Sequence, residues 1–362
     1  MPDLVVAGAG MAGLVAAAEA RRLGAEPLVL EKLERPGGSM RLSSGVIWRH
    51  RELDRFKADC PEGDERLQTR LYDRLDSDIG WLESLGAPVT ERETGNPLTT
   101  GARFDPERLT AALVEAAGGP SPSAEGGVHL GVALTEPPDY APLVLATGGF
   151  GASRDLLREL VTAEAEHIFI RAAPGATGDG LRIGLAAGAA TSPGLDQVYA
   201  RLMPAPPAQI EPGDLVRLSQ LYAGRARVAN AHGESYTTRT WSEIDVAQWA
   251  ARQPRARAWL RVEARRLGER VRDRRVGEMV DAAEAAGAPV HRDREHVTVE
   301  TVAGITSTLG GLSVDEHAET APGVFACGAD MGGIATGGYA SGLAAALVFG
   351  RVAARAALGE AT

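Results

Sequence analysis

The stretch VVAGAGMAGLVAAAEARRLGAEPLVLEK, Val5 to Lys32, decides the fold that we expect of this chain. Residues 4–6 are apolar and predict a short buried strand, and the glycine-rich hexapeptide at 8–13 predicts a tight turn. The alanine-rich run that follows predicts a helix that Gly24 ends. Residues 28–30 predict a second strand, so the whole stretch has the order of a βαβ unit.

The spacing of three glycines and one acid in this stretch indicates a dinucleotide site. Gly8 makes the turn, Gly10 lets the backbone approach a pyrophosphate, and Gly13 lets helix and strand pack closely. The free N–H groups at the helix start face the phosphate charge. Glu31 ends the second strand, where a carboxylate binds ribose hydroxyls and disfavours a ribose 2′-phosphate. The alternative is a glycine-rich turn in an ordinary α/β core.

The composition is that of a globular protein with two lobes. With 362 residues the chain is too long for one compact core. Its formal net charge of −10, with Lys32 and Lys57 as the only lysines, disfavours nucleic acid and anionic membranes as partners. The longest apolar run, 342–349, is far too short to span a membrane, and the chain starts on its first strand without room for a signal peptide. We therefore expect a cytoplasmic protein.

The cysteines and histidines indicate no metal. Cys60 and Cys327 lie in no Cys-x-x-Cys or Cys–His spacing, which argues against an iron–sulfur cluster, a structural zinc and a redox dithiol. The histidines form no ligand spacing or catalytic triad, and hydrolase motifs are missing from the sequence. Redox chemistry would depend on an organic cofactor.

Three further segments offer backbone amides and small hydroxyls. Residues 37–45 contain two glycines, three serines and a third glycine, and they could lie along a long, phosphate-containing cofactor. A plain surface loop is the alternative. Residues 143–145 predict a buried strand that ends in Thr147 and Gly148, at a second close backbone approach. Asp179 is placed to cap a helix that starts near Gly180.

The rest of the chain predicts a mixed α/β fold with an inserted lobe. Helices are expected at 66–85 and 106–117, and the alternating residues 128–136 predict a strand of a small β-meander. Arginines at 252–275 form a basic helix pattern, which predicts a solvated helix face or a lobe contact. A buried strand at 324–327 and a helix from near Ser341 follow. The expected division is a first segment at 1–203, a capping domain at 204–300 and a closing segment at 301–362.

Seven motifs resemble, in order and across nearly the whole chain, one flavoprotein family. They are GAGMAG…EK…PGGS, LSSGVIW, LATGGFG, TGDGLRIGLAAGA, VANAHGESY, TSTLGGLSVD and GADMGGIATGGYASGLAAALVFGRVAAR. The family contains fumarate reductase, the succinate dehydrogenase flavoprotein subunit, 3-ketosteroid Δ1-dehydrogenase and tricarballylate dehydrogenase. The resemblance implies a Rossmann-like FAD-binding domain formed by both chain ends, with an abbreviated inserted lobe that caps the flavin.

The resemblance also implies how FAD is held. Glu31 would bind the adenosine ribose, and the helix from Ser341 would point its N-terminus at the flavin N1 and O2 edge, where it favours the reduced flavin. Ser39 and Met40 stand where covalent members carry a flavin-linking histidine, so the FAD should be non-covalent. Asp330 is displaced from the family's acidic position. The expected FAD contacts are Gly8, Gly10, Met11, Ala12, Gly13, Glu31, Lys32, Gly37, Gly38, Ser39, Ser43, Ser44, Gly45, Ala146, Thr147, Gly148, Asp179, Gly328, Asp330, Ser341, Gly342 and Leu343.

The groups that bind dicarboxylates in this family are missing. Tyr222 lies near the position of the proton-delivering arginine, Ser307 replaces a histidine, and Gly337 falls where the last arginine would be. Each missing charge-assisted hydrogen bond forfeits about 1.5–3 kcal/mol, which disfavours fumarate and succinate. The remaining candidates around the pocket are aromatic or hydroxylic, with one arginine as a nearby charge. We predict as catalytic residues Tyr222, Tyr339, Arg201 and Ser307, with Tyr199 and Trp48 beside them.

The expected activity follows from this set. As in the ketosteroid dehydrogenases, tyrosines would polarise a ketone and take a proton while hydride moves between the flavin N5 and a carbon–carbon bond next to the carbonyl. A tyrosine base would need a neighbouring donor or positive charge, and Arg225 or Arg227 could supply it for Tyr222. The alternative for each tyrosine is a packed residue with a satisfied hydroxyl.

We therefore expect an FAD-dependent oxidoreductase acting on CH–CH donors, with a weakly charged, cyclic small molecule as substrate. The electron acceptor could be a quinone, oxygen or a small redox protein. Two alternatives remain open. One is an FAD-dependent oxidase or dehydrogenase acting on a C–N or C–O bond, and the other is a flavin-binding protein without turnover.

Overall fold

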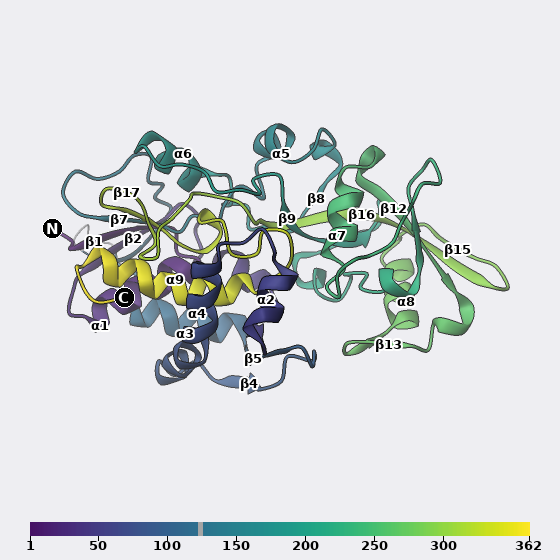
Figure 1. Cartoon of the computed structure of the whole chain (residues 1–362), viewed down its shortest axis with the longest axis horizontal. Helices are drawn as coiled ribbons and strands as arrows, with labels where there is room; N and C mark the ends of the chain where they lie inside the picture. Colours follow the sequence, from purple (N-terminus) through teal and green to yellow (C-terminus); the bar gives the residue numbers. More distant parts are fainter. Residues whose placement is uncertain (122–125) are drawn as a thin grey trace. The chain divides into compact units, whose positions relative to one another are not determined.

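The computed structural model describes residues 1–121 and 126–362, and Figure 1 labels many of its helices and strands. The chain divides into two units. Unit 1 comprises Met1–Ser153, Ala173–Leu195 and Thr308–Thr362, and unit 2 comprises Arg154–Ala172 and Asp196–Ser307. The segment 154–172, which the expected division placed in 1–203, goes with unit 2 because its strand β8 (Phe169–Ile170) pairs with β16 (His296–Thr308).

The centre of unit 1 is a six-stranded sheet in the order β17-β18-β7-β1-β2-β6. All neighbours are parallel except β17 and β18. The central strands are continuous apolar runs because a parallel sheet is covered on both faces. Val5 of β1 stands in register between Leu28 of β2 and Leu143 of β7. The strands are β1 (Leu4–Ala7), β2 (Pro27–Glu31), β6 (Gly127–Leu130), β7 (Leu143–Leu145), β17 (Glu319–Ala321) and β18 (Val324–Ala326).

Strand β6 corrects one expectation from the sequence. Residues 128–136 were expected to belong to a small antiparallel meander, but 127–130 pair in parallel with β2 at the edge of the main sheet, and 131–136 form no strand. Alternation along one strand does not specify the direction of its neighbour, which is why the pattern misled. A separate antiparallel sheet has the order β3 (Val46–His50), β5 (Thr99–Phe104) and β4 (Val89–Glu91).

Helices α1 and α9 bring the two chain ends together in unit 1. The yellow α9 runs beside the purple α1 in Figure 1, and no other pair of described elements packs more extensively. A Cβ atom on Gly350 of α9 would stand 2.6 Å from the carbonyl oxygen of Ala12, so the close approach requires glycine there. The helices of unit 1 are α1 (Met11–Arg22), α2 (Leu53–Asp59), α3 (Glu65–Ser84), α4 (Pro106–Ala116), α6 (Asp179–Ala186) and α9 (Gly342–Ala357).

Helices α3 and α4 begin where the sequence predicts. Asp64 accepts hydrogen bonds from the amides of Arg66 and Leu67 at the start of α3. Asp105 accepts one from the amide of Arg108 at the start of α4, whose first residue is a proline. The predicted strand–turn–helix–strand order of 4–31 is confirmed as well, with helix α1 ending before Gly24 at φ +87°.

Unit 2 is built on an antiparallel sheet in the order β11-β10-β12-β16-β15, and β8 and β9 also pair with β16. The arginine-rich segment 252–275 is not a helix, contrary to expectation. It contains strand β12, in which the buried Leu260 and Val262 alternate with Arg261 and Glu263, and the small hairpin β13–β14. The elements are α5 (Arg154–Leu160), β9 (Val198–Pro204), β10 (Arg227–Ala229), β11 (Ser235–Tyr236), α7 (Ile244–Ala251), β12 (Arg257–Glu263), β13 (Arg270–Val271), β14 (Arg274–Arg275), α8 (Val276–Ala285) and β15 (Val290–Arg292).

Candidate functional site

The three glycines of the turn between β1 and α1 differ in their surroundings. Two of them pack against backbone atoms, and the third faces open space. Gly8 has φ +103°, and a Cβ atom there would stand 2.3 Å from the carbonyl oxygen of Ala146. A Cβ atom on Gly13 would stand 1.9 Å from the carbonyl oxygen of Gly8. A Cβ atom on Gly10 would meet nothing within 4 Å. Gly8 and Gly13 are therefore required by the fold, whereas Gly10 borders free space.

The start of α1 carries no side-chain cap. Gly10 is the N-cap, no acidic residue lies in the first turn, and the first helical bond runs from the amide of Leu14 to the carbonyl of Gly10 at 3.0 Å. In the described part of the chain, the amides of Ala12 and Gly13 have no acceptor, whereas the isolated parallel bridge between Gly10 and Gly37 engages the amide of Met11. Such amides, together with the helix dipole, bind anions such as phosphate.

Glu31 ties this turn to the end of β2. One carboxylate oxygen accepts from the amide of Ala9 at 2.8 Å, and the other accepts from the amide of Leu33 at 2.9 Å. The neighbouring Lys32 points elsewhere, because its ammonium donates to Thr177 Oγ1 at 2.6 Å and pairs with Asp179. Glu31 thus stands at the dinucleotide turn, while Lys32 belongs to a polar cluster at the start of α6.

The first residues of the segment 37–45 contact the glycine turn between β1 and α1. The amide of Gly37 donates to the carbonyl of Ala9 at 2.7 Å, and a Cβ atom on Gly38 would stand 3.3 Å from Cα of Gly10. The serines have internal partners. Ser39 Oγ accepts from the amide of Ala173 at 3.0 Å, and Ser43 Oγ accepts from the amide of Gly45 at 3.0 Å. Ser44 is exposed.

Asp330 organises the loop after β7. Its carboxylate accepts from the amide of Gly149 at 2.9 Å, from Thr147 Oγ1 at 3.0 Å and from the amide of Thr147. Only 1% of Asp330 is exposed, and burial raises the pKa of its carboxyl while the donors from Gly149 and Thr147 oppose that shift. Asp330 therefore fixes the backbone of the 146–149 turn, and its contact with FAD stays a prediction.

The start of α6 corrects the expectation for Asp179. The helix begins at Asp179 itself, and Gly178, with φ +86°, is the N-cap without a side-chain hydrogen bond. The Asp179 carboxylate instead pairs with Lys32 and Arg182. Its negative charge in the first turn still complements the helix dipole. The sequence placed the cap one residue too late because glycine, with no capping side chain, occupies that position.

The start of α9 carries a serine cap. Ser341 Oγ accepts from the amide of Ala344 at 3.2 Å, and the amides of Gly342 and Leu343 donate to no acceptor among the described residues. A Cβ atom on Gly328, which has φ +65°, would stand 2.9 Å from Cβ of Ala12. Gly328, one of the predicted FAD contacts, thus lies against Ala12 in the first turn of α1.

Two of the predicted aromatic residues meet in unit 1. The ring centroids of Trp48 and Tyr339 are 5.2 Å apart, and His50 stands edge-on to Trp48 at 5.5 Å. His50 Nε2 lies 3.2 Å from Asp59 Oδ2. Burial lowers the pKa of His50 even though Asp59 opposes that shift, so the imidazole is neutral near pH 7. Trp48, Tyr339 and His50 thus form a cluster of rings in contact with one another.

The other predicted catalytic residues lie in unit 2. Arg201 donates through Nε to the hydroxyl of Tyr199 at 3.2 Å and through Nη1 to the carbonyl of Ser242. Ser307 is half-buried near the end of β16. Tyr222 is fully buried, and its hydroxyl has no hydrogen-bond partner within 1–121 and 126–362.

The surroundings of Tyr222 do not suit a base. Arg225 pairs with Glu269 at 2.9 Å and Arg227 donates to Ser235 at 3.1 Å, so both expected cations are engaged elsewhere. The nearby charge is the carboxylate of Glu243, which the sequence analysis did not single out. Burial, and then this negative charge, raise the pKa of Tyr222. The phenol therefore keeps its proton in the neutral pH range.

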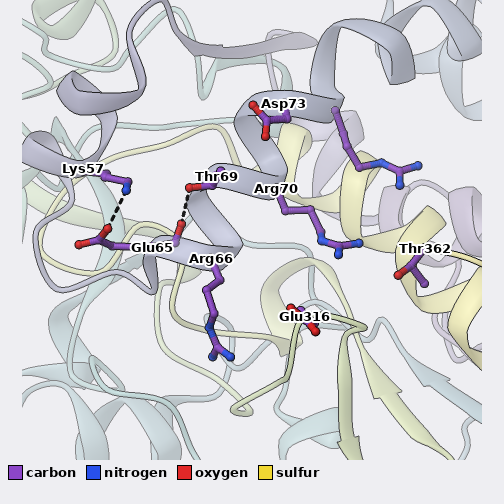
Figure 2. A pocket seen from close by; sticks show the side chains of 9 residues that line it. Lys57, Glu65, Arg66, Thr69, Arg70, Asp73, Glu316 and Thr362 are labelled. Carbon is purple, nitrogen blue, oxygen red and sulfur yellow. Dashed lines mark hydrogen bonds and ion pairs between the residues drawn. The ribbon is translucent and has the colours of Figure 1, made fainter.

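A charged groove of about 560 Å³ also lies in unit 1 (Figure 2). Lys57 and Glu65 point toward each other across it at 2.6 Å, and Arg66 pairs with Asp64 at 2.8 Å. None of the predicted site residues lines this groove, which contains both signs of charge. Its lining residues are Lys57, Glu65, Arg66, Thr69, Arg70, Asp73, Arg74, Glu316 and Thr362.

The sequence that forms the glycine turn, helix α1 and the start of α9 lies within the match to a family model. The model described as an FAD binding domain covers residues 3–116 and 138–343. The chain belongs to this family. FAD is accordingly its cofactor, and the open face of Gly10 beside the amides of Ala12 and Gly13 fits a diphosphate. The family predicted from the sequence is thus confirmed.

Solved structures of this FAD-binding family share the fold. A flavocytochrome c3 fumarate reductase in its open conformation has a TM-score of 0.69 at 21% identity, over 99% of this chain and 78% of the other. A 3-ketosteroid Δ1-dehydrogenase from Sterolibacterium denitrificans, in complex with 1,4-androstadiene-3,17-dione, has a TM-score of 0.68 at 15% identity, over 99% of both chains. At these identities the likeness concerns the fold alone.

One curated relative has a recognisably similar sequence. Vinyl phenol reductase from Lactiplantibacillus plantarum is 26% identical over 225 residues, which are 52% of this chain. The matched stretch spans 46% of that protein, less than half of its length.

The residues that the structure describes lack two kinds of feature. They contain no helix that is both long and apolar enough to span a membrane. They also contain no group of three or more histidine, cysteine or acidic side chains that could hold a metal ion.

Proposed function

We propose that this flavoprotein is a reductase or dehydrogenase that acts on a carbon–carbon bond next to a carbonyl or another conjugated group in a weakly charged, cyclic substrate. The observation that carries the proposal is the character of the predicted substrate residues. Trp48 and Tyr339 form an aromatic pair in unit 1, and the one arginine predicted for the pocket, Arg201, is engaged by Tyr199 and Ser242. Such a set favours a flat, uncharged molecule over a dicarboxylate.

The residues of this chain would hold FAD and polarise the substrate. Bound FAD supplies hydride exchange at its N5 atom. The amides of Ala12 and Gly13 would bind its diphosphate, Glu31 its ribose, and the amides of Gly342 and Leu343 would favour negative charge at the helix start. Each of these contacts is proposed, and the amides without acceptors at the starts of α1 and α9 support those with the diphosphate and the flavin.

Tyr222 would act as a hydrogen-bond donor. Because burial and Glu243 raise its pKa, it holds its proton across the neutral range. A phenol in this state can polarise a carbonyl oxygen or donate a proton in the reducing direction, but it cannot remove a proton from an α-carbon near pH 7. Tyr339 is the remaining candidate for a base.

The name of the curated relative supports the class of bond. Vinyl phenol reductase is named for reducing a carbon–carbon double bond conjugated to an aromatic ring. The solved relatives named above are a fumarate reductase and a ketosteroid dehydrogenase. We extend only the shared bond type to this chain, with a quinone, oxygen or a small redox protein as the proposed electron partner.

Anaerobic titration tests the proposal. The protein is reconstituted with FAD, photoreduced and mixed with one compound from each class: a cyclic enone, a vinyl phenol, fumarate and an imine. We expect the flavin absorbance near ~450 nm to return with the enone or the vinyl phenol at least about tenfold faster than with fumarate. In the reverse direction, a saturated cyclic ketone should bleach the oxidised flavin.

Other outcomes would contradict the proposal. Reaction with the imine, or bleaching by amines or alcohols alone, would favour chemistry on a C–N or C–O bond. A flavin that no compound reoxidises faster than free reduced FAD would indicate a binding protein without turnover.

A further inference from the structure

Glu243 has an unusual backbone conformation at the start of α7. Its φ is +60° and its ψ is +16°, in the left-handed region that side-chain-bearing residues rarely adopt. Strained residues of this kind persist only where surrounding contacts hold them, and they concentrate at functional sites. The conformation therefore calls for an explanation in terms of what it positions.

Capping of α7 does not explain it. The Glu243 side chain makes no capping hydrogen bond, although Glu243 is the N-cap residue. The helix start is served by its neighbours, because Ser242 Oγ accepts from the amide of Ile244 at 3.4 Å. Asp245 collects the hydroxyls of Thr238 and Thr240 at 3.0 and 2.7 Å. The Glu243 carboxylate is thus free for another task.

That carboxylate reaches the short turn that follows Tyr222. Its Oε1 atom accepts from the amide of Gly224 at 2.8 Å, within the 3-10 turn Ala223–Arg225. Its Oε2 atom is buried and has no hydrogen-bond partner in the parts of the chain that the structure describes. The hydroxyl of Tyr222 is in the same state. The buried acceptor Oε2 of Glu243 and the buried hydroxyl donor of Tyr222 therefore both lack a hydrogen-bond partner, and they are not bonded to each other.

The backbone just before Glu243 holds Arg201. Nη1 of Arg201 donates to the carbonyl of Ser242, so one strained residue turns its own carboxylate toward Gly224 and the preceding carbonyl toward Arg201. The positive charges of Arg201 in β9 and Arg272 in the β13–β14 turn lower the pKa of the Glu243 carboxyl. The negative charge of this carboxyl raises the pKa of Tyr222.

We propose that Glu243 is a positioning residue of unit 2: through Gly224 it fixes the turn that carries Tyr222, and through the carbonyl of Ser242 it fixes Arg201. The inference deepens the proposed function, on which its kinetic test rests. Burial raises the pKa of Glu243, and the amides of Gly224 and Ala223 and the two arginines oppose this shift.

The first test compares pH profiles. Glu243→Gln keeps an acceptor for the Gly224 amide but cannot titrate, and Glu243→Ala removes both functions. With the substrate found above, we expect kcat/KM of the wild type to change through the titration of Glu243, and E243Q to lose that limb of the profile. E243A should fall further, by about 10²-fold, because a displaced turn misplaces Tyr222. Glu211→Gln, an exposed acid in the same unit, is the matched control and should keep the wild-type profile.

The second test needs no substrate. A carboxyl whose folded pKa is raised stabilises the fold below its unfolded pKa of about 4.3, and that stability is lost as the pH rises through the folded pKa. The Tm of E243Q minus that of the wild type should therefore increase between pH 5 and 8, by about 2 °C or more. Glu243→Asn, which tolerates the positive φ, provides a folded non-titrating variant if E243Q is unstable.

The two tests distinguish failure of this inference from failure of the proposed function. A wild type that turns over none of the compounds would remove the proposed function, while the dependence of Tm on pH would still report on Glu243. The inference is overturned if E243Q retains every limb of the pH profile, or if its Tm difference from the wild type is the same at pH 5 and pH 8.

Discussion

Arg351 of α9 donates through Nε to Oε2 of Glu19 in α1, at 3.1 Å, in the interior of unit 1. The same guanidinium pairs with Asp78 of α3 and lies 4.5 Å above the ring of Trp81. Glu19 and Asp78 are fully buried. Three helices from distant parts of the chain are thus joined by one arginine, and both chain ends depend on it.

Replacing Arg351 by methionine should destabilise unit 1 strongly. The change leaves two buried carboxylates with one partner fewer, which costs about 3–5 kcal/mol. Urea unfolding of the FAD-free protein measures this loss. Arg92→Met, which removes an exposed ion pair with Glu83, is the matched control and should stay within about 1 kcal/mol of the wild type.

The pH dependence of that loss has a defined sign. Burial alone would raise the pKa of Glu19, yet the hydrogen bonds from Arg22 and Arg351 lower it from 4.5 to about 2. A lowered folded pKa gives stability that is present above the unfolded pKa and is lost as the pH falls toward 2. The difference between wild type and R351M should therefore shrink between pH 5 and pH 3. A constant difference would mean that Glu19 does not depend on Arg351.

The glycines of the first turn predict two different defects. Gly10→Ala places a methyl group where the protein offers no contact within 4 Å, so the Tm without FAD should be unchanged. The affinity for FAD should fall by at least about tenfold, since the methyl occupies the space of the diphosphate. Gly13→Ala, with its Cβ atom 1.9 Å from the carbonyl oxygen of Gly8, should lower both the Tm without FAD and the affinity for FAD.

Isothermal titration with FAD and thermal unfolding separate these two cases. Gly80→Ala, in helix α3 with no neighbour within 4 Å, is the control and should bind FAD like the wild type. Unchanged FAD affinity in G10A would show that the diphosphate lies elsewhere.

The first βαβ unit could be predicted from sequence because its signals are local. Apolar runs, the glycine turn and Glu31 lie within 28 residues, and each has one structural meaning there. Patterns with several meanings failed. Alternation at 128–136 did not reveal that β6 would pair in parallel with β2, and arginines at 252–275 concealed strand β12.

The finer parts of the site depend on contacts that a sequence does not display. Asp330 meets Gly149 across 181 positions of the chain, so its role in holding that turn has no local signature. Glu243 went unnoticed because nothing in its neighbours' types announces a positive φ. Tyr222 could be singled out as a candidate from its place in the motif order, but its protonation state follows from burial and from Glu243.

Asp330 should affect FAD binding through the loop that it holds. Asp330→Ala leaves the amides of Thr147 and Gly149 without their acceptor and should destabilise the protein by about 2–4 kcal/mol. Asp330→Asn keeps one acceptor oxygen and should lose less. The FAD affinity should fall in the same order, as followed by quenching of flavin fluorescence. Asp73→Ala, at an exposed position, is the control, and an unstable D330A that binds FAD normally would contradict this role.

Tyr222→Phe should stabilise the protein while it impairs the reaction. A buried hydroxyl without a partner costs about 1–3 kcal/mol, so its removal should raise the free energy of unfolding or leave it unchanged. Loss of the proposed donor should lower kcat by about tenfold or more. Tyr72→Phe is the matched control, because the Tyr72 hydroxyl donates to the carbonyl of Arg51 at 2.7 Å and its loss should be slightly destabilising. A group retained for function can cost the fold stability, so a functional hydroxyl predicts a Y222F variant that is stable but less active. A Y222F variant that is less stable and fully active would show instead that the hydroxyl serves packing.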